Sequence, residues 1–311
     1  MSEQWTAADI PDQARRTAVV TGANSGLGLV TARELARAGS GVVLACRNTE
    51  KGTVALESIR EAVPGAAVTV EKLDLSSLDS VRAFAARFAT AYDGLDLLIN
   101  NAGVMAPPRR ETTDGFELQL GTNHLGHFAL TGLLLGRMQG REDARVVTVT
   151  SAAHRIGRID FDDLQRRRHY FRWSAYGQSK LANLLFAREL DLRLRAAGST
   201  VSSMAAHPGY AATNLQSAAP PALDRWAMAL ANHLFAQSAE MGALPELYAA
   251  TRHYLDGGLF IGPDGPNEQR GYPKVVSPSR AGRSGATADR LWTVSEELTG
   301  VSYEFGQNAK T

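Results

Sequence analysis

The stretch TAVVTGANSGLG, residues 17–28, joins a β-branched apolar run to a turn with three glycines, and a helical pattern follows in residues 28–39. Gly22, Gly26 and Gly28 permit positive φ and a close approach of the backbone to a ligand. The first turn of a helix offers free N–H groups and the positive end of the helix dipole, which favour phosphate. Three glycines could also form a flexible loop, and their G-x-x-x-G-x-G spacing differs from the common dinucleotide fingerprint. Their position after the first strand of a β-α unit favours a nucleotide-binding turn.

Strand and helix patterns alternate along most of the chain. Apolar, β-branched runs occur at residues 17–22, 41–47, 67–74, 95–103, 144–151, 200–209 and 258–263, with helical patterns between them. The runs are continuous rather than alternating, as expected for strands covered on both faces. We therefore predict an α/β fold with a single-domain, doubly wound parallel sheet (Rossmann-like) of about seven strands, with helices on both faces.

Three segments make up the expected domain organisation. Residues 1–14 form an N-terminal extension, residues 15–265 a Rossmann-type catalytic domain, and residues 266–311 a C-terminal extension that packs on the same domain. The tail is richer in Gly, Pro and Ser, and residues 286–300 have the pattern of one more helix.

Composition narrows the possible partners and the cellular location. The 311 residues carry a formal net charge of +1, which does not favour a nucleic acid or an anionic membrane. The basic, aromatic run RRRHYFRW, residues 166–173, is short and follows acidic residues, so an exposed loop is favoured over a nucleic-acid site. The single cysteine, Cys46, excludes an intrachain disulfide and fits a reducing compartment. Because residues 1–16 lack the apolar core of a secretory signal and no run approaches ~18 apolar residues, we expect a cytoplasmic protein without a transmembrane segment.

The end of the second predicted strand bears on the choice of cofactor. An acid there would bind the ribose 2′-OH of NAD, whereas an arginine suits the 2′-phosphate of NADP. Arg47 stands at this place, without Asp or Glu, and Ser25 could add a hydroxyl to the same phosphate. We therefore predict that NADP(H) is preferred and that NAD(H) is possible, although Arg47 could instead be a surface charge. Asp74, after the third strand, would lie near the adenine or cap the following helix.

Tyr176 and Lys180, in SAYGQSK at residues 174–180, are four positions apart at the start of a helical pattern. Residues at this spacing lie on the same face of a helix. A phenol with a pKa near 10 needs roughly 4 kcal/mol of preference for phenolate to ionise at neutral pH. One ammonium at about 4 Å supplies about that much at an effective dielectric constant of 20. The pair therefore suits a general acid/base for an alcohol or carbonyl oxygen, although Y-x-x-x-K also occurs by chance.

Other polar residues follow neighbouring predicted strands. Ser151 ends the fifth strand, at the edge where α/β sheets bind ligands, and no G-x-S-x-G elbow surrounds it. Asn123, in the helical region after the fourth strand, could hold a water or bend the helix, or be a buried structural amide. NNAG, residues 100–103, provides small residues for a close backbone approach. His124 and His127 are accompanied by no acid or cysteine at ligand spacing, so no metal site is expected.

Taken together, TGANSGLG, NNAG, Asn123, Ser151 and YGQSK resemble the short-chain dehydrogenase/reductase family, in order and at family spacing, over roughly residues 15–265. CRN, HFAL and IDFDDLQ are similar to its retinol-dehydrogenase-like branch. The resemblance implies that Tyr176 is the acid/base, that Lys180 lowers its pKa and binds the nicotinamide ribose, and that Ser151 polarises the substrate oxygen. Asn123 would hold a water that connects Lys180 to solvent. The four catalytic residues match the family, and one small departure, TS in place of the usual SS at residues 150–151, leaves the second serine intact.

The resemblance also implies the residues that hold the cofactor. They are Gly22, Asn24, Ser25, Gly26, Leu27, Gly28, Arg47, Asp74, Leu75, Asn101, Ala102, Gly103, Tyr176, Lys180, Pro208, Gly209 and Thr213.

The expected function is an NADP-dependent oxidoreductase that moves a hydride between nicotinamide and an alcohol or carbonyl substrate. The alternatives are a sugar-nucleotide epimerase or dehydratase, and a redox sensor that binds the cofactor without turnover. In this fold, residues 210–237 would cover the nicotinamide as a lid. Leu223, Trp226, Leu230 and Leu234 recur there at helical spacing and predict either a lipophilic pocket or packing on the domain. A homo-oligomer is possible.

Overall fold

The computed structural model describes residues 4–209 and 237–306. Thr213 and the apolar stripe expected between Leu223 and Leu234 lie outside the described residues, as does all of the expected lid except Gln237.

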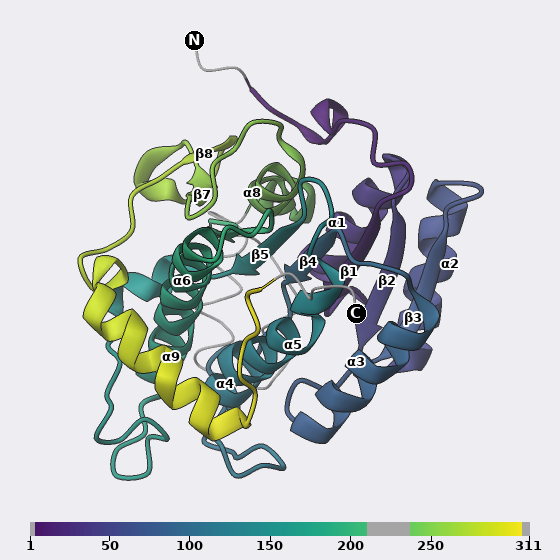
Figure 1. Ribbon diagram of the computed structural model, residues 1–311. Coiled ribbons are helices and arrows are strands. Elements are labelled where there is room, and N and C mark those ends of the chain that lie inside the picture. Colours follow the sequence, from purple (N-terminus) through teal and green to yellow (C-terminus); the bar gives the residue numbers. More distant parts are fainter. Residues whose placement is uncertain (1–3, 210–236, 307–311) are drawn as a thin grey trace.

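The centre of the molecule is one sheet in the order β3-β2-β1-β4-β5-β6-β7-β8 (Figure 1). All neighbouring strands are parallel except β7 and β8. The order reverses between β1 and β4, which makes this the switch point where α/β sheets bind ligands. The strands are β1 (Thr17–Thr21), β2 (Gly41–Cys46), β3 (Val68–Lys72), β4 (Leu97–Asn100), β5 (Arg145–Val149), β6 (Ser202–Ala206), β7 (Phe260–Pro263) and β8 (Pro273–Val275).

The sheet therefore has eight strands rather than about seven. The additional strand, β8, pairs antiparallel with β7 in the register Ile261↔Val275. It is three residues long and lies in a region rich in Gly and Pro, so its sequence has no strand-like period. Its pairing depends on β7, which supplies the hydrogen-bonding edge.

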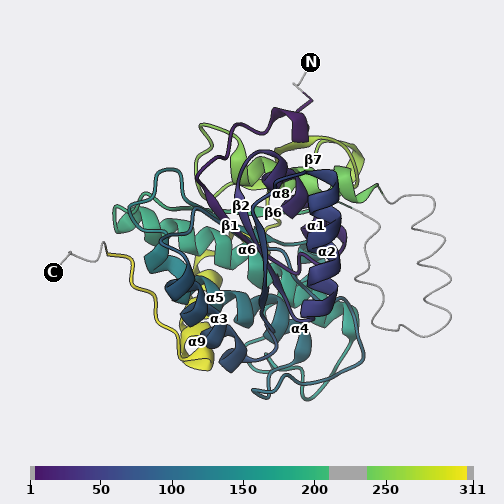
Figure 2. The same ribbon diagram turned by 90° about the vertical axis from the view of Figure 1, so that its right-hand side faces the viewer.

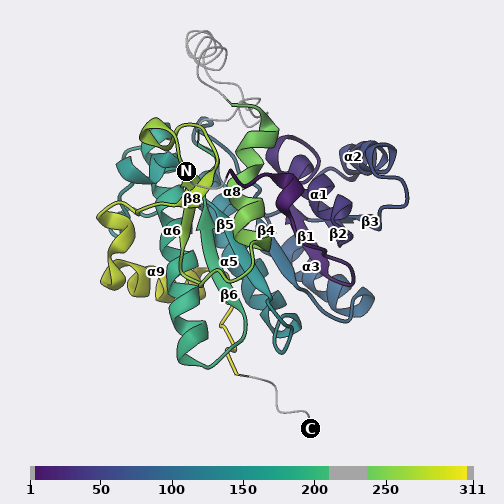
Figure 3. The ribbon, with the colours of Figure 1, turned by 90° about the horizontal axis from the view of Figure 1, so that it is seen from above.

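Helices cover both faces of the sheet (Figure 3). Helices α1 (Gly26–Arg37), α2 (Thr49–Ala62) and α8 (Ala239–Thr251) pack on one face, against side chains such as Val20 and Ile99. Helices α3 (Leu78–Ala91), α5 (Gly126–Leu134), α6 (Arg172–Ala196) and α9 (Gly285–Thr299) share the other face, with Val19 and Leu98. Neighbouring valines point to opposite faces because side chains alternate along a strand. The shorter helical segments are η1 (Ala7–Asp9), α4 (Leu118–Leu120), η2 (Gly121–Leu125), η3 (Leu135–Arg137), η4 (Ala152–Ile156), η6 (Pro266–Glu268) and η7 (Ala281–Arg283).

Both terminal segments pack on this body (Figure 2). Near the N-terminus, the buried Trp5 meets Tyr248 of α8 edge to face, with ring centroids 5.2 Å apart. Near the C-terminus, Trp292 of α9 and Tyr303 contact Phe128 of α5 at 5.1 Å and 4.9 Å. Aromatic groups of this size contribute much of the apolar area that a core buries.

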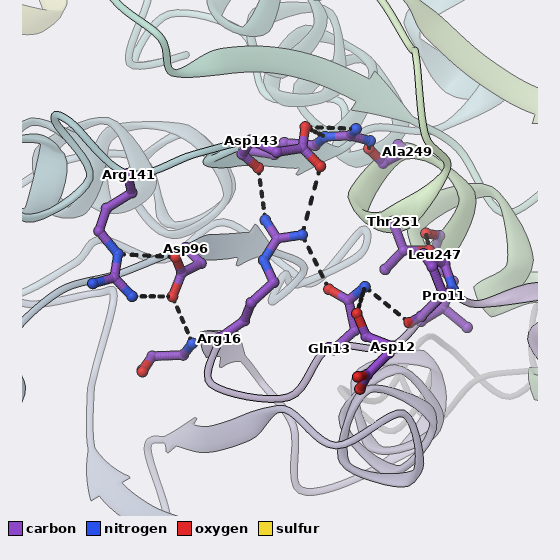
Figure 4. A network of polar contacts seen from close by, with 12 residues as sticks. Pro11, Asp12, Gln13, Arg16, Asp96, Arg141, Asp143, Leu247, Ala249 and Thr251 are labelled. Atoms are coloured by element: carbon purple, nitrogen blue, oxygen red, sulfur yellow. Dashed lines mark hydrogen bonds and ion pairs between the residues drawn. The ribbon is translucent and has the colours of Figure 1, made fainter.

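An ion-pair network lies at the amino ends of β1, β4 and β5 (Figure 4). Arg141 donates two hydrogen bonds to Asp96, at 2.9 Å and 2.8 Å, and Asp96 also accepts one from the backbone of Thr17 at 2.7 Å. Arg16 donates to the carbonyl oxygen of Asp143 at 2.6 Å. Ligands of α/β sheets bind at the carboxyl edge, so this network joins strand ends and is not part of the ligand site.

Within the described residues, no helix combines the length and the apolar character that a membrane span requires.

Candidate active site

Three side chains expected to carry chemistry meet at the carboxyl end of β5. Ser151 is the N-cap of η4, two residues after β5 ends. Tyr176 and Lys180 lie one turn apart on α6, with the Lys180 Nζ 5.9 Å from the centre of the Tyr176 ring. The Ser151 side chain is close enough to Tyr176 to lower the pKa of its hydroxyl. The fold thus brings together a hydroxyl, a phenol and an ammonium from two segments.

The direction of Lys180 is set by its neighbours. Its Nζ donates to the carbonyl oxygen of Val149 at 3.1 Å, and Asn183 Nδ2 donates to the same oxygen at 3.1 Å. Thr150 Oγ1 donates to the carbonyl oxygen of Lys180 at 2.6 Å. These bonds join α6 to the end of β5 and hold the ammonium at the carboxyl edge of the sheet.

Asn123 lies on η2, a π-helical segment that interrupts the helix between α4 and α5. Its amide nitrogen donates to the Val104 carbonyl oxygen at 3.0 Å and to Ser179 Oγ at 2.9 Å. Its amide oxygen accepts from the Val104 N–H at 2.7 Å. A Cβ on Gly103 would lie 3.1 Å from Asn123 Oδ1 and 3.5 Å from Lys180 Nζ, so Gly103 stands directly beside both side chains. The amide therefore positions the chain after β4, and the water-holding role implied by the resemblance stays a prediction.

The glycine turn has the shape that a dinucleotide phosphate requires. Gly22 and Gly26 have φ of 67° and 57°, in the left-handed region that favours glycine. A Cβ on Gly28 would lie 2.4 Å from Asn101 Nδ2 and 2.8 Å from the Gly22 carbonyl oxygen, so the packing of the turn against NNAG requires glycine here. Ser25 is the N-cap of α1 without a side-chain cap bond, and the first turn of α1 has no acid. The residues present therefore fit a nicotinamide dinucleotide, with Asn24 and the buried Leu27 in the same turn.

Sequence reasoning missed Thr21, which joins the glycine turn to NNAG. Its Oγ1 accepts hydrogen bonds from the N–H groups of Asn101, at 3.0 Å, and Ala102, at 2.9 Å. Asn101 Nδ2 donates to the Thr21 carbonyl oxygen at 2.7 Å. A threonine at a strand end is too common for the sequence to single it out.

The residues expected near the adenosine lie at the ends of β2 and β3. Arg47 directly follows β2 and is exposed. Asp74 Oδ1 accepts from Ser76, from the N–H at 3.0 Å and from Oγ at 2.6 Å. The carboxylate thus stabilises the turn before α3, whose N-cap is Ser77. A contact between Asp74 and the adenine stays a prediction. Leu75 is buried next to it.

Burial dominates the ionisation of the acid/base pair. It raises the pKa of Tyr176 to about 12, and the Ser151 side chain acts in the opposite direction. Burial also lowers the pKa of Lys180 to about 8, while the charge of Glu246 raises it. Low polarity penalises both the phenolate and the ammonium. The expectation that Lys180 lowers the pKa of Tyr176 stays a prediction.

Glu246 of α8 is a second group that the sequence did not reveal. One carboxylate oxygen accepts a hydrogen bond from Thr31 Oγ1 of α1, and the other has no partner among the described residues. Burial raises the pKa of Glu246 to about 7, against the opposing effects of Thr31 and Lys180. An acid within a helix is ordinarily exposed, so only the packing of α8 on α1 reveals its burial.

The two histidines after Asn123 are structural in their contacts. His127 Nε2 lies 2.9 Å from Thr21 Oγ1, and its Nδ1 lies 2.9 Å from the carbonyl oxygen of Asn123. His124 Nε2 lies 2.9 Å from Ser295 Oγ. Burial lowers the pKa of His127 to about 4 and that of His124 to about 3. Over residues 4–209 and 237–306, no three side chains of the metal-binding kind gather at one place.

Known proteins resemble this chain over most of its length. The family model of the short chain dehydrogenases matches residues 16–224. Retinol dehydrogenase 12 of Homo sapiens is 45% identical over 289 residues, covering 93% of this chain and 88% of that protein. Retinol dehydrogenase 13 of Homo sapiens is 40% identical over 293 residues, covering 92% and 85%.

Solved structures confirm the Rossmann-like fold. An uncharacterised protein from Mycobacterium paratuberculosis has 48% sequence identity and a TM-score of 0.81, covering 97% of this chain and 100% of that one. A protein described as an NAD(P)-dependent gluconate 5-dehydrogenase from Beutenbergia cavernae, with NADP bound at low occupancy, has 26% identity and a TM-score of 0.62, covering 80% of this chain and 95% of that one.

Proposed function

Because this chain belongs to the short-chain dehydrogenase family, in its retinol-dehydrogenase-like branch, we propose that it is an NADP-dependent oxidoreductase acting on a lipophilic alcohol or carbonyl compound. The observation that carries the proposal is the juxtaposition of Ser151, Tyr176 and Lys180 at the carboxyl end of β5. The bound cofactor would supply or accept the hydride. The glycine turn, NNAG and Lys180 would hold it there.

In the direction of reduction, the chain must deliver a proton to the substrate oxygen. The Tyr176 hydroxyl would donate that proton, and Ser151 would donate a hydrogen bond to the same oxygen. An ammonium has three N–H donors, and Lys180 donates one of them to the Val149 carbonyl oxygen. The other two would be available to a ribose hydroxyl and to the Tyr176 oxygen. With a pKa of about 12, Tyr176 is protonated at neutral pH and ready to act as an acid.

In the direction of oxidation, Tyr176 must first lose its proton. Burial opposes this loss, so a positive charge beside the phenol is needed to stabilise the phenolate. Lys180, with a pKa of about 8, is largely charged at neutral pH and would provide part of that stabilisation.

Arg47 supports the preference for NADP(H). It is exposed at the end of β2, where it is free to meet a 2′-phosphate, and no acid occupies that place. The Beutenbergia cavernae protein, which has the same fold, carries NADP.

Apolar side chains on α6 and η4, the two segments that carry Tyr176 and follow Ser151, support a lipophilic substrate. Trp173 lies one turn before Tyr176 on α6, with the ring centroids 6.2 Å apart. Phe171 at the start of α6 and Ile156 at the end of η4 are 65% and 69% exposed. The relatives are named for retinol, which is an apolar alcohol. The cytoplasmic location and the homo-oligomer expected from sequence stay predictions.

A panel of aldehydes, ketones and alcohols assayed with NADPH or NADP tests the proposal. We expect NADPH to be consumed with aldehydes, and kcat/KM to rise about fourfold for each added methylene, since each contributes about 0.8 kcal/mol until the pocket is full. A flat series would contradict the lipophilic substrate and leave the redox activity standing. NADPH binding without consumption by any compound would favour a redox sensor.

A further inference from the structure

A carboxylate between β7 and β8 lies between two loops of the candidate active site. Glu268 Oε2 accepts a hydrogen bond from Arg155 Nη2 at 2.7 Å and lies 3.1 Å from His207 Nε2. Arg155 belongs to η4, which starts directly after Ser151. His207 directly precedes Pro208 in the chain. One carboxylate thus joins the loop after β5 to the loop after β6.

We propose that Glu268 is a positioning residue that holds the turn formed by Pro208 and Gly209 in the geometry required by the cofactor, acting through His207. This inference rests on the proposed function and on the family resemblance, which implies that Pro208 and Gly209 hold the cofactor. Glu268 lies beyond residues 16–224, which the family model matches, whereas the turn lies within them.

The hydrogen bonds of His207 define its tautomer. The N–H of Gly209 donates to His207 Nδ1 at 3.3 Å, so Nδ1 carries no proton. The N–H on Nε2 is then directed at Glu268 Oε2, 3.1 Å away. Without the carboxylate, the ring could take the other tautomer, and Gly209 would lose its acceptor. A carboxylate that accepts a hydrogen bond from one ring nitrogen fixes the tautomer, and so it determines whether the second ring nitrogen can accept a hydrogen bond.

The histidine has no room to turn away. His207 is fully buried, and its ring centroid lies 5.1 Å from that of Phe260. A Cβ on Gly262 would lie 2.2 Å from His207 Nε2, so the ring occupies the space that a side chain there would fill. A change at Glu268 is therefore passed to Gly209 through a ring that packing holds in place.

The rest of the turn is held from the same side. Gln237 Nε2 donates to the Pro208 carbonyl oxygen at 2.6 Å, and Gln237 Oε1 accepts from the N–H of Gly271 at 3.2 Å. Gly209 has a φ of 67°, and a Cβ there would lie 2.4 Å from the carbonyl oxygen of Gln269. Pro208 and Gly209 therefore both rest on the segment that carries Glu268.

The backbone at Glu268 is unfavourable for a residue with a side chain. Asn267 and Glu268 have φ of 53° and 57°, in the left-handed region that suits glycine. Such conformations persist where surrounding contacts enforce them, and they concentrate at functional sites. The hydrogen bonds from His207 and Arg155 hold the pKa of Glu268 at about 2, so the carboxylate stays charged across the usual assay range.

The test measures cofactor binding directly, in wild type and three variants. Glu268→Gln keeps the shape of the side chain and removes its charge. Arg155→Gln removes one of the two partners of Glu268, and Arg155 itself is an exposed side chain. Glu297→Gln, an exposed acid of α9, is the matched control. The NADPH dissociation constant is obtained from nucleotide fluorescence, and the melting temperature and steady-state kinetics are recorded for each variant.

We expect Glu268→Gln to raise the dissociation constant and the cofactor KM about tenfold, which corresponds to about 1.4 kcal/mol, with kcat at saturating cofactor nearly unchanged. Arg155→Gln should raise the dissociation constant and the cofactor KM by a smaller factor. Glu297→Gln should match wild type in both. A purely structural role would lower the melting temperature and leave the dissociation constant unchanged, which would overturn the inference. If Glu268→Gln does not fold, Arg155→Gln decides alone, and wild-type affinity there overturns the inference. A wild-type protein that binds no NADP(H) overturns the proposed function as well.

Discussion

Lys180 Nζ donates a hydrogen bond to the carbonyl oxygen of Val149, the last residue of β5, at 3.1 Å. The sheet therefore sets the direction of this ammonium, and α6 alone does not. Because Lys180 is buried, its charge depends on polar groups near it, among them the Val149 carbonyl oxygen, and on the charge of Glu246. The pH dependence of the reaction should report on this arrangement.

Replacing Tyr176 tests the acid/base assignment. Tyr176→Phe removes the transferable proton and keeps the ring that packs against Trp173. We expect kcat to fall by at least ~10² to 10⁴, as is usual when acid/base catalysis is lost, with NADPH affinity nearly unchanged. The matched control is Tyr254→Phe, because Tyr254 is fully exposed. Wild-type turnover by Tyr176→Phe would show that another group moves the proton.

Arg47 should determine the choice between the two cofactors. Wild type is expected to prefer NADP(H), and Arg47→Asp should narrow or reverse the preference, because the aspartate repels a 2′-phosphate and suits a ribose hydroxyl. A charge-assisted contact contributes roughly 1.5–3 kcal/mol, or tenfold to more than a hundredfold in kcat/KM. Arg110→Asp, at another exposed arginine, serves as the control. Equal kcat/KM for both cofactors in wild type would contradict the prediction.

The ionisation of Lys180 should appear in the pH profile of carbonyl reduction. The protonated phenol is available at all pH values below about 12, so the limiting group is Lys180, with a pKa of about 8. We expect kcat/KM to be level below pH 8 and to fall above it. In Glu246→Gln the fall should begin at lower pH, since the carboxylate raises the pKa of Lys180. Glu240→Gln, on the exposed side of the same helix, should keep the wild-type profile, and an unchanged profile in Glu246→Gln would refute the coupling.

Thr21→Val tests the link between the glycine turn and NNAG. The change keeps the shape of the side chain and removes the acceptor of the Ala102 N–H, while the Asn101 N–H keeps its bond to the Ile99 carbonyl oxygen. A buried unsatisfied donor costs ~1–3 kcal/mol, so the free energy of unfolding should fall by at least that much and the cofactor KM should rise. Thr53→Val, on the exposed face of α2, is the control for loss of a threonine hydroxyl. A cofactor KM equal to that of wild type would limit Thr21 to a role in stability.

Acid should destabilise the fold through three buried histidines. Burial lowers the pKa of His127 and His154 to about 4 and that of His124 to about 3. Between these values and the ordinary histidine pKa of about 6.5, the unfolded chain therefore binds more protons than the folded chain. The contribution of the neutral histidines to stability is complete above pH ~6.5 and is lost as pH falls toward 4. Three acids whose pKa burial raises act in the opposite sense and partly offset the histidines: Glu246, with a pKa of about 7, Glu117 and Asp191.

Urea unfolding at pH 7.0 and pH 5.0 measures this effect. Each net proton taken up on unfolding changes the free energy of unfolding by about 1.4 kcal/mol per pH unit. His154→Asn should reduce the difference between the two pH values, and His253→Asn, at an exposed histidine, should not. Equal stability of the wild type at both pH values would contradict the prediction.

The sequence predicted the strands and their order along the chain well. The seven expected strands correspond to β1 to β7, and the helix expected at residues 286–300 corresponds to α9. Each of these signals is local, because apolar period and turn residues act within one or two turns of chain. The strand β8 has no such signal and exists only because β7 offers it an edge.

The sequence by itself also determined the glycine turn and the one-turn spacing of Tyr176 and Lys180. Only the tertiary structure decided that Thr21 meets Asn101, 80 positions away, and that Arg155 meets Glu268, 113 positions away. Contacts of this kind depend on which strands become neighbours and how helices pack on them. The arrangement of strands and helices is determined by the burial of the whole core, so it cannot be predicted from any local pattern of residues.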